Sequence, residues 1–362
     1  MSKKKNTSEW RAKLAEIDCQ IVALLDRRFA LARELQADPA RAAALPGATP
    51  EHLAVALRQL EDVPAEALPK ETLKAVFREV WSGTAALAQP PRIAFFGQRM
   101  TYTHQAAMAS FGHGAEYIEQ PTIRDVFDAV SRGEATCGVV PVENSTEGAV
   151  THTLDMFADS EVSICSELNL PIHHCLLANC AEDRIEVLYS HPQVFGQCRR
   201  WLYRTMPEAH LVEVTSTTEA AARAAREAEH AGALASELAA SAYGLTVRRA
   251  NIEDSTDNTT RFLVLGKQMP EPTGDDKTSI LMAIRHRVGA LYESLLPFGK
   301  HGVNLTFIES RPSKRKNWEY YFFIDFLGHV SEPQARAVLQ ELGEICQFVK
   351  ILGSYPRAAD GK

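Results

Sequence analysis

The sequence predicts a multidomain protein with an all-α helical N-terminal part, a central α/β part and a small α+β part at the C-terminus. Three observations predict this division. Residues 1–90 contain no convincing strand pattern, short apolar runs alternate with amphipathic helices from Arg92 onward, and the stretch 269–277, with its prolines, glycine and acids, is typical of a linker. The length of 362 residues agrees with two to three domains of roughly 150 residues each.

One helical seam runs through the first part. Its positions recur at steps of three and four residues, as Leu14, Ile17, Ile21, Leu24, Arg28, Leu31 and Leu35. Because Arg28 places a cation among apolar residues, it requires an anionic partner, either a helix glutamate in a salt bridge or a ligand. Asp38-Pro39 ends this helix, residues 51–60 and 70–87 predict two more, and Gln89-Pro90-Pro91 closes the unit.

The central part alternates apolar runs of strand length with helices, which predicts layers of helix on sheet. The predicted strands are residues 93–96, 138–142, 172–178, 187–190, 211–214 and 262–265. Most of these runs are continuously apolar, as expected for strands that are covered on both faces. A ligand would then bind beyond the carboxyl ends of the strands.

The last part has the order β-α-β-β-α-β, which is the ferredoxin-like arrangement. Its predicted elements are residues 278–285, 289–300, 304–309, 320–326, 333–345 and 348–352.

Composition excludes several classes of protein. The net charge of -7 argues against a nucleic-acid-binding chain, and no apolar run approaches the roughly 20 residues that span a bilayer. The basic start, Met1 to Lys5, is not followed by the apolar region of a secretory signal. The seven cysteines form no C-x-x-C pair, which favours reduced thiols over disulfides or a zinc site. We therefore expect a cytoplasmic protein without a metal, a nucleic-acid partner or a membrane partner.

Four polar clusters follow or begin predicted strands, where a cleft site would need them. They are Thr101-Tyr102-Thr103, Asn144-Ser145-Thr146, Ser190-His191-Pro192-Gln193 and Thr259-Thr260-Arg261-Phe262. Taken singly, Asn144, Ser145 or Ser190 is equally compatible with a plain helix cap. A guanidinium at Arg261 can grip a carboxylate at two points. The sequence has neither G-x-x-x-x-G-K-[ST] nor G-x-G-x-x-G after a strand, so we expect acid-assisted chemistry without a cofactor.

These motifs resemble known families. Residues 92–268 resemble the prephenate dehydratase domain on the strength of Val140-Pro141-Val142-Glu143-Asn144-Ser145 with Gly148, Ser190-His191-Pro192-Gln193 and Thr260-Arg261-Phe262. Residues 278–356 resemble the ACT regulatory domain on the strength of Gly289-Ala290-Leu291-Tyr292 and Glu309-Ser310-Arg311-Pro312. The chain is thus similar to the P-protein family, in which chorismate mutase is fused to prephenate dehydratase. The resemblance implies a two-lobed α/β catalytic domain of periplasmic-binding-protein-like architecture, followed by a ferredoxin-like ACT domain.

The resemblance also implies roles for the motif residues in converting prephenate to phenylpyruvate, water and carbon dioxide. In the catalytic motif Thr260-Arg261-Phe262, Thr260 would give or relay a proton to the leaving hydroxyl and Arg261 would hold a carboxylate. The substrate would be positioned by Thr101, Asn144, Ser145, Ser190 and Gln193. Met100 departs from the family, because a glycine is usual at that place in the first loop, and a positive φ there would strain the loop.

The helical unit, residues 1–90, resembles the chorismate mutase domain more loosely. Arg11 and Arg28 match its arginine pair, but Pro39 stands where a lysine is expected, and Thr84 and Ala88 stand for a serine and a glutamine. Chorismate rearrangement needs cations at both carboxylates and a donor on the ether oxygen, and losing such a donor costs roughly 3 kcal/mol or more. We expect weak or lost mutase activity and a helical unit kept mainly for dimerisation or stability.

The ACT resemblance implies feedback inhibition by phenylalanine, bound between copies in a homodimer or homotetramer. The residues that would line the phenylalanine site are Gly289, Ala290, Leu291, Asn304, Glu309, Ser310 and Arg311. Two alternatives remain open: a fully bifunctional mutase and dehydratase, and a catalytically inactive amino-acid sensor. The intact Thr260-Arg261-Phe262 favours a catalyst.

Overall fold

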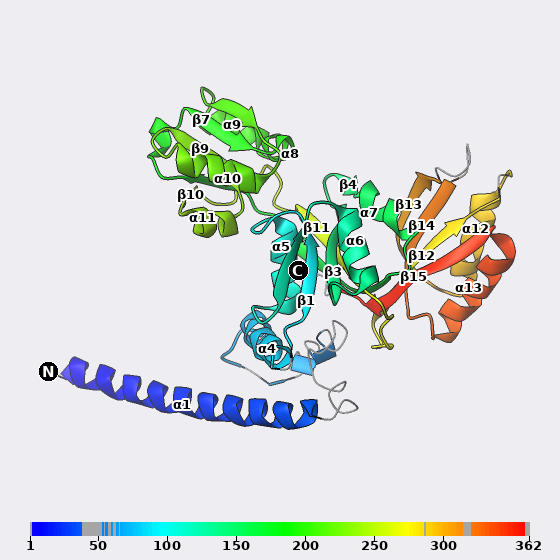
Figure 1. Ribbon diagram of the computed structural model, residues 1–362, viewed down its shortest axis with the longest axis horizontal. Coiled ribbons are helices and arrows are strands. Elements are labelled where there is room, and N and C mark those ends of the chain that lie inside the picture. Colours follow the sequence, from blue (N-terminus) through cyan, green and yellow to red (C-terminus); the bar gives the residue numbers. More distant parts are fainter. Residues whose placement is uncertain are drawn as a thin grey trace. The chain divides into compact units, whose positions relative to one another are not determined.

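The computed structural model (Figure 1) describes the residues that are given at the end of this paragraph, without the side chains of residues 2–7. Pro39, Ala88 and most of the expected second helix lie outside them. The chain divides into two compact units, residues 1–91 with 111–116 and residues 92–110 with 117–362. The described residues are 2–37, 53, 55–56, 59–60, 63–64, 66–87, 89–285, 287–313 and 320–358.

The first unit contains the seam helix α1 (Ser2–Gln36) and α4 (Lys70–Ala85). Arg28 is half-buried, and its NH1 donates a hydrogen bond to Thr84 Oγ1 at 2.5 Å. Thr84 in turn donates to the backbone oxygen of Val80 on its own helix. The partner of Arg28 is thus a hydroxyl rather than the helix glutamate that one reading expected, and this bond links the two helices.

The second unit begins with a lobe that we call lobe 1, built on a mixed sheet of order β2-β1-β3-β11-β5, with β4 paired to β3 (Figure 1). Strand β1 is parallel to β3, whereas β11 is antiparallel to both β3 and β5. Its elements are β1 (Arg92–Phe96), α5 (Tyr102–Phe111), β2 (Glu116–Gln120), α6 (Ile123–Arg132), β3 (Cys137–Asn144), β4 (Gly148–Ala149), α7 (Thr151–Phe157), β5 (Ser163–Pro171) and β11 (Thr259–Gly266). Strand β11 therefore returns from the far part of the chain to lie between β3 and β5.

Lobe 2 is a second α/β layer with the strand order β10-β6-β9-β7-β8. Its elements are β6 (Cys175–Ala178), the 3-10 helix η2 (Glu182–Arg184), β7 (Val187–Ser190), α8 (Pro192–Gln197), α9 (Arg199–Thr205), β8 (His210–Glu213), α10 (Thr217–Arg226), β9 (Ala231–Ala235), α11 (Glu237–Tyr243) and β10 (Thr246–Arg249). The chain crosses between the lobes twice, at residues 172–174 and 250–258. Two backbone bonds tie these crossovers, Ile172 N to Asn258 O at 2.8 Å and Ile252 N to His174 O at 2.9 Å.

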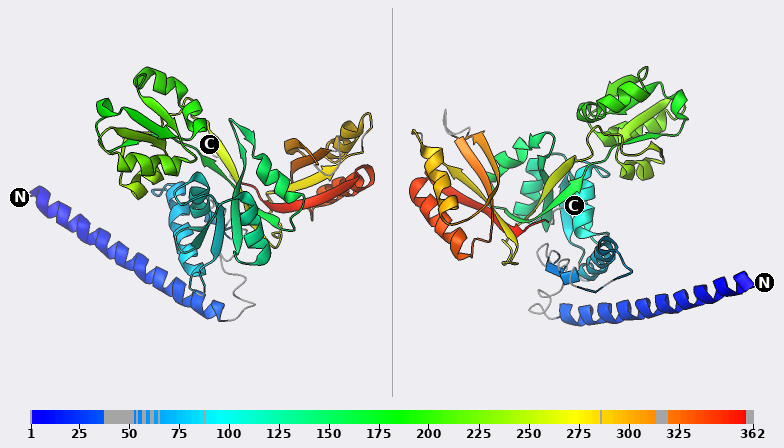
Figure 2. Two further views of the ribbon diagram at one scale, coloured as in Figure 1. Left: turned by 45° about the horizontal axis from the view of Figure 1, so that its top comes forward. Right: turned by 180° about the vertical axis from the view of Figure 1, so that it is seen from behind.

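The C-terminal sheet has the order β13-β14-β12-β15, with α12 and α13 against one face (Figure 2). Its elements are β12 (Asp276–Ala283), α12 (Ala290–Lys300), β13 (Leu305–Pro312), β14 (Tyr320–Leu327), α13 (Pro333–Ile345) and β15 (Phe348–Pro356). This is the predicted β-α-β-β-α-β order. The other face shares a hydrophobic core with lobe 1, in which Leu263 and Leu265 pack with Leu281, Phe323 and Leu352.

The expected fold class, a helical part followed by two-lobed α/β and ferredoxin-like α+β parts, is confirmed. The predictions omitted five strands, β2, β4, β5, β9 and β10. All seven cysteines are free thiols. Among the described helices, none combines the length and apolar character needed to cross a membrane.

Candidate active site

Thr260 and Asn144 form the centre of the candidate site. They lie opposite each other where β11 begins and β3 ends. Asn144 Nδ2 donates a hydrogen bond to Thr260 Oγ1 at 2.8 Å. Because the threonine oxygen already accepts this bond, its own proton is available to an acceptor in the cleft, and the amide polarises the hydroxyl toward giving that proton.

The side-chain amide of Asn144 is held in one orientation. Its Oδ1 accepts hydrogen bonds from Thr146 N at 3.0 Å, Thr146 Oγ1 at 2.6 Å and Glu147 N at 3.1 Å. Its Nδ2 also donates to Asn258 Oδ1 at 2.8 Å. With the oxygen occupied by three donors, the nitrogen has to face Thr260, so the turn after β3 fixes this contact.

Hydrogen bonds continue from Asn144 across the crossovers into lobe 2. Asn258 donates to Gln197 Oε1 at 3.2 Å, and the same oxygen lies 2.7 Å from His174 Nε2. His174 Nδ1 lies 2.9 Å from the hydroxyl of Tyr102. Oε1 of Gln197 can only accept, so His174 carries its proton on Nε2, and its Nδ1 shares the single proton of the Tyr102 hydroxyl with the backbone oxygen of His173, which lies 2.7 Å from that hydroxyl. The two lobes are thereby joined by one polar network beside Thr260.

Three members of this network, His174, Gln197 and Asn258, were missed by sequence reasoning, and Tyr102 was named in a polar cluster without a role. Gln197 follows the predicted Gln193 by one helical turn, and Asn258 precedes Thr260 by two residues on extended chain. Those spacings place side chains on a shared face and could have identified both residues. His174 offered no comparable signal, because its neighbours come from distant segments.

Burial sets the charge state of the crossover residues. Burial lowers the pKa of His174 below its usual 6.5, so the ring is neutral near pH 7. Glu253 is also buried, yet its pKa is lowered because a hydrogen bond with His173 and one from the backbone N–H of His174 outweigh desolvation. The distances are 2.7 Å for His173 Nδ1 and 2.9 Å for His174 N. Glu253 therefore connects the two crossovers through hydrogen bonds of its ionised carboxylate.

The other predicted substrate-binding residues lie in different surroundings. Thr101 donates to Gln98 O at 2.8 Å at the start of α5, and Ser145 donates to Asp257 O and accepts from Thr259 N, each at 3.0 Å. Gln193 is exposed on α8. Ser190 is 0% exposed and donates to Leu234 O at 2.7 Å, which joins β7 to β9. The hydroxyl of Ser190 therefore faces the interior of lobe 2 rather than a ligand.

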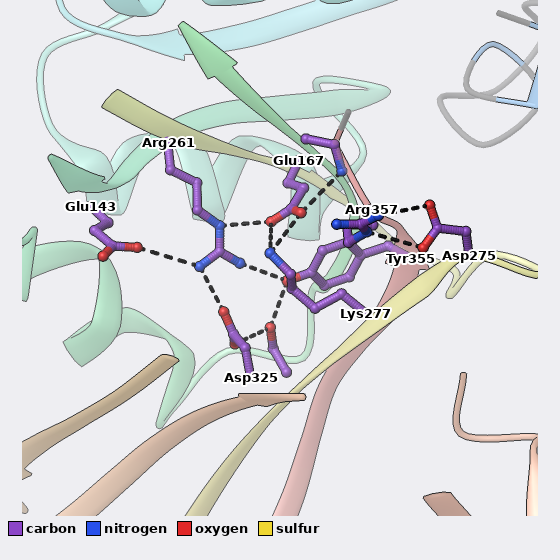
Figure 3. Close-up of polar contacts among 10 residues, drawn as sticks. Glu143, Glu167, Arg261, Asp275, Lys277, Asp325, Tyr355 and Arg357 are labelled. Carbon is purple, nitrogen blue, oxygen red and sulfur yellow. Dashed lines mark hydrogen bonds and ion pairs between the residues drawn. The ribbon is translucent and has the colours of Figure 1, made fainter. Parts of the chain in front are cut away.

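Arg261 turns to the face of β11 opposite Thr260 (Figure 3). Its Nε lies 2.6 Å from Glu167 Oε2, its NH1 lies 2.6 Å from Asp325 Oδ2, and its NH2 donates to Tyr355 Oη at 3.0 Å. Consecutive strand side chains point to opposite faces, so Thr260 and Arg261 cannot both face the cleft. The guanidinium meets protein carboxylates in place of the expected substrate carboxylate, and Phe262 is a buried core residue.

Comparison with known proteins identifies the family. The family model for prephenate dehydratase matches residues 93–270, and that for the ACT domain matches residues 278–344. A bifunctional chorismate mutase/prephenate dehydratase from Aquifex aeolicus is 45% identical over 97% of this chain and 98% of its own length. The chain belongs to the bifunctional chorismate mutase/prephenate dehydratase family. It is an enzyme of the prephenate dehydratase class with an ACT domain.

Two solved structures resemble the dehydratase and ACT regions. One is a prephenate dehydratase from Arthrobacter aurescens in complex with L-Phe, with a TM-score of 0.68 and 33% identity, covering 74% of this chain and 90% of that one. The other is GqqA, a quorum-quenching acylase, with a TM-score of 0.68 and 28% identity, covering 74% and 98%. The shared fold thus accommodates a second named activity, and the residues of the site have to decide the function.

The predicted phenylalanine residues fall at two ends of the ACT sheet. Gly289, Ala290 and Leu291 begin α12, near the end of β12. Glu309, Ser310 and Arg311 pair through β14 with that same end of β12. Asn304 precedes β13 at the other end, about 20 Å away at roughly 3.3 Å per strand residue. One copy of the chain cannot enclose a small ligand with all of these residues.

The mutase-like residues are also separated within one chain. Arg28 and Thr84 are in contact, as described above. Arg11 is exposed on α1, about 25 Å from Arg28 at 1.5 Å per helical residue. Burial lowers the pKa of Arg28, and within the part of the chain that the structure describes its hydrogen-bond partner is the Thr84 hydroxyl.

Met100 has φ 69°, in the left-handed region, where this family usually has glycine. The condition under which strain was expected, a positive φ at this position, is met. A side chain in that region costs roughly 1 kcal/mol or more. His104 supports the loop, because its Nδ1 accepts a hydrogen bond from Met100 N at 3.2 Å.

We predict that Met100→Gly raises the unfolding free energy by roughly 1 kcal/mol, because glycine removes the steric cost of the positive φ. Denaturant unfolding measures the change. Gln98→Gly in the same loop is the matched control and should destabilise, because Gln98 has no positive φ. A destabilised Met100→Gly protein would show that the loop is not strained.

We predict that stability falls as pH drops below about 6.5. The pKa of His174 is lowered in the folded protein, so as the pH falls the histidine is protonated in the unfolded chain before it is protonated in the folded protein. Protonation therefore stabilises the unfolded state and lowers the free energy of unfolding. The slope should reach roughly 1 kcal/mol per pH unit. His174→Gln should reduce the slope to the part contributed by buried His104, whose pKa is also lowered by burial. The exposed control His210→Gln should keep the wild-type slope, and an unchanged slope in His174→Gln would contradict the assignment.

Proposed function

We propose that this chain converts prephenate to phenylpyruvate, water and carbon dioxide, with residues 92–268 as the dehydratase domain, residues 278–356 as the ACT domain and residues 1–90 as the mutase-like unit. The hydrogen bond from Asn144 to Thr260 carries the proposal, because it orients a hydroxyl proton toward the cleft. We place the reaction in the cytoplasm, in keeping with the seven free thiols.

The chemistry requires an acid and an oriented dianion. The bond to the ring carboxylate breaks, its electron pair enters the ring, and the C–O bond of the ring hydroxyl breaks to complete the aromatic system. Thr260 gives its proton to the departing hydroxide and is reprotonated by one proton taken up from the solution, so that the dianion and this proton yield the phenylpyruvate anion, carbon dioxide and water. Thr101, Asn144, Ser145 and Gln193, with Gln197 added, position the substrate. A threonine is a weak acid in water, so orientation supplies much of the effect.

We predict that Thr260→Ala lowers kcat for prephenate by about 100-fold or more, with little change in KM, because only the proton donor is lost. The measurement is phenylpyruvate formation by the purified full chain. Thr260→Ser keeps the hydroxyl and should keep most of the activity. Full activity in Thr260→Ala would refute the assigned acid, and an inactive wild-type chain would favour an amino-acid sensor.

Phenylalanine is the proposed effector, bound between ACT domains of two copies. Asn304 and Gly289 lie at opposite ends of one sheet. Two antiparallel copies side by side would therefore bring Asn304 of one copy close to Gly289 of the other. Strand β13 is the edge of the sheet, and Ile308 on it is 46% exposed. In the prephenate assay, phenylalanine should lower the rate, and lack of inhibition at any concentration would remove this part of the proposal.

The mutase activity is proposed to be weak or lost. Arg28 is already bonded to Thr84, and the departure at position 39 removes a further cation. Full bifunctionality is the alternative, and the named activity of the relative that matches 97% of this chain favours it. Supplying chorismate to the same preparation decides between the two, because only a working mutase leads on to phenylpyruvate.

We also propose that α1 dimerises. Much of its apolar seam, including Leu14, Ile17, Ile21, Leu24 and Leu31, is exposed within its own unit. Two antiparallel copies of α1 would cover these side chains and bring Arg11 of one copy toward Arg28 of the other.

We predict that a charge in the seam, Leu24→Glu, halves the mass of the particle measured by light scattering, because it would bury an unpaired carboxylate between helices. Glu34→Gln, an exposed change on the same helix, is the control and should leave the mass unchanged. A Leu24→Glu chain with wild-type mass would show that α1 is not the contact.

A further inference from the structure

A buried ionic cluster, which we call the joint, connects the face of β11 that carries Arg261 to the ACT sheet (Figure 3). Lobe 1 contributes Arg261 and Glu167, and the ACT sheet contributes Lys277, Asp325 and Tyr355. Besides the three Arg261 contacts, Lys277 Nζ lies 2.8 Å from Glu167 Oε1. Two cations thus meet two carboxylates from different domains, and the tyrosine hydroxyl accepts from Arg261.

The members of the joint are shielded from solvent. Glu167 is 6% exposed, Asp325 5%, and Arg261 and Lys277 9% each. Burial alone would lower the pKa of Arg261, but Asp325 and its other partners raise that pKa well above its usual value. Burial likewise opposes the ionised form of Glu167, yet Arg261 and Lys277 lower its pKa. Arg261 and Glu167 are therefore charged, and removing a partner of either leaves a charge unpaired in a dry environment.

Adhesion between the domains does not depend on the joint. The ACT sheet and lobe 1 already share one hydrophobic core. Their backbones also approach closely, since a Cβ added to Gly353 on β15 would lie 2.3 Å from Ile164 O on β5. Buried ion pairs add little stability compared with apolar residues of the same volume. Because they need particular distances and orientations, they fix the relative position of the segments that carry them. The joint therefore specifies the position of β11 against the ACT sheet.

The joint has no room for the effector itself. The cavity lined by Arg261, Asp325, Ser279 and Phe307 measures about 10 Å³, the space of one water, whereas ligand pockets span roughly 300 Å³ or more. An effect of phenylalanine must reach the joint through the sheet. Strand β14 provides a direct connection, because Tyr321 to Phe323 pair with Arg311 to Glu309 and Asp325 follows two residues later.

The joint is one residue away from the catalytic contact on both strands. Thr260 pairs with Asn144 on the cleft side, and the next pair along the same strands is Arg261 with Glu143. Arg261 NH1 lies 3.7 Å from Glu143 Oε2, so it contacts β3 as well as β5 and β14. A shift of Asp325 would pull on Arg261 and thereby alter the distance or angle of the Asn144 to Thr260 bond.

We propose that Arg261 is a positioning residue for Thr260 and that its ion pair with Asp325 couples the ACT sheet to the catalytic bond. The inference rests on the proposed dehydratase function and its inhibition by phenylalanine. Arg261 holds β11 in the active register while its ion pair with Asp325 is formed. Binding of the effector to the ACT domain weakens this ion pair.

The test variant is Asp325→Asn, which keeps the shape and removes the charge. Prephenate kinetics are measured with the full chain, with and without saturating L-phenylalanine, and phenylalanine binding is measured by calorimetry. We expect kcat without effector to fall several-fold at nearly constant KM, and the fold-inhibition by phenylalanine to fall about fivefold or more while phenylalanine still binds. Asp325→Glu restores the charge and should recover part of the inhibition.

Lys350→Gln is the matched control. Lys350 Nζ donates to Phe157 O at 3.1 Å and to Ser160 O at 2.6 Å, so it also joins the ACT sheet to lobe 1, but it does so away from β11. This variant should keep the wild-type kcat and fold-inhibition. Equal loss of inhibition in Lys350→Gln would overturn the proposal, because general docking would then explain the effect.

A wild-type kcat and wild-type inhibition by phenylalanine in Asp325→Asn would also overturn the proposed coupling. If Asp325→Asn fails to fold, Ser279→Ala serves in its place, because it removes the 2.5 Å hydrogen bond to Asp325 Oδ1 and keeps every charge. The same direction of change, at smaller size, is expected, and unchanged inhibition there counts against the joint. A wild-type chain inactive on prephenate would instead remove the proposed function.

Discussion

The two faces of strand β11 are the constraint on which the rest of the molecule depends. One face presents Thr260 to Asn144, and the other presents Arg261 to Glu167 and Asp325. Because the side-chain period of a strand is two, a catalytic group and a domain-joining group can be neighbours in sequence without being neighbours in space. The motif Thr260-Arg261-Phe262 therefore combines a site residue, a joint residue and a core residue.

A second network serves the opposite side of the same strand. Asn258, Gln197 and His174 link the turn after β3 to lobe 2 through neutral hydrogen bonds, whereas the joint is built from charges. Neutral bonds between lobes can be exchanged at low cost when a substrate enters. Buried ion pairs cannot be exchanged so easily, which suits a contact that holds the ACT sheet and lobe 1 in a fixed register.

Prediction from the sequence succeeded where the signal was local. The helical seam gave α1, the apolar runs gave β1, β3 and β7, and the positions of Asn144 and Thr260 at strand ends gave their place in the site. It failed for β9, because Ala231 to Ala235 consists of three alanines, one glycine and one leucine, which lacks β-branched residues and becomes a strand only when neighbouring strands bury it. The prediction failed for β5 because a glutamate such as Glu167 is typical of the protein surface and not of a buried strand.

The sequence by itself determined the three kinds of domain, the order of elements in the ACT region and the motifs that resemble the dehydratase and ACT families, because periodicity and turn chemistry act over a few residues. Only the tertiary structure decided which face of β11 each motif residue occupies, that Ser190 is buried, and that Arg261 meets Asp325 from a strand far along the chain. A charge chooses its partner by distance in the folded state, and that distance is set by packing between segments that the local pattern does not connect.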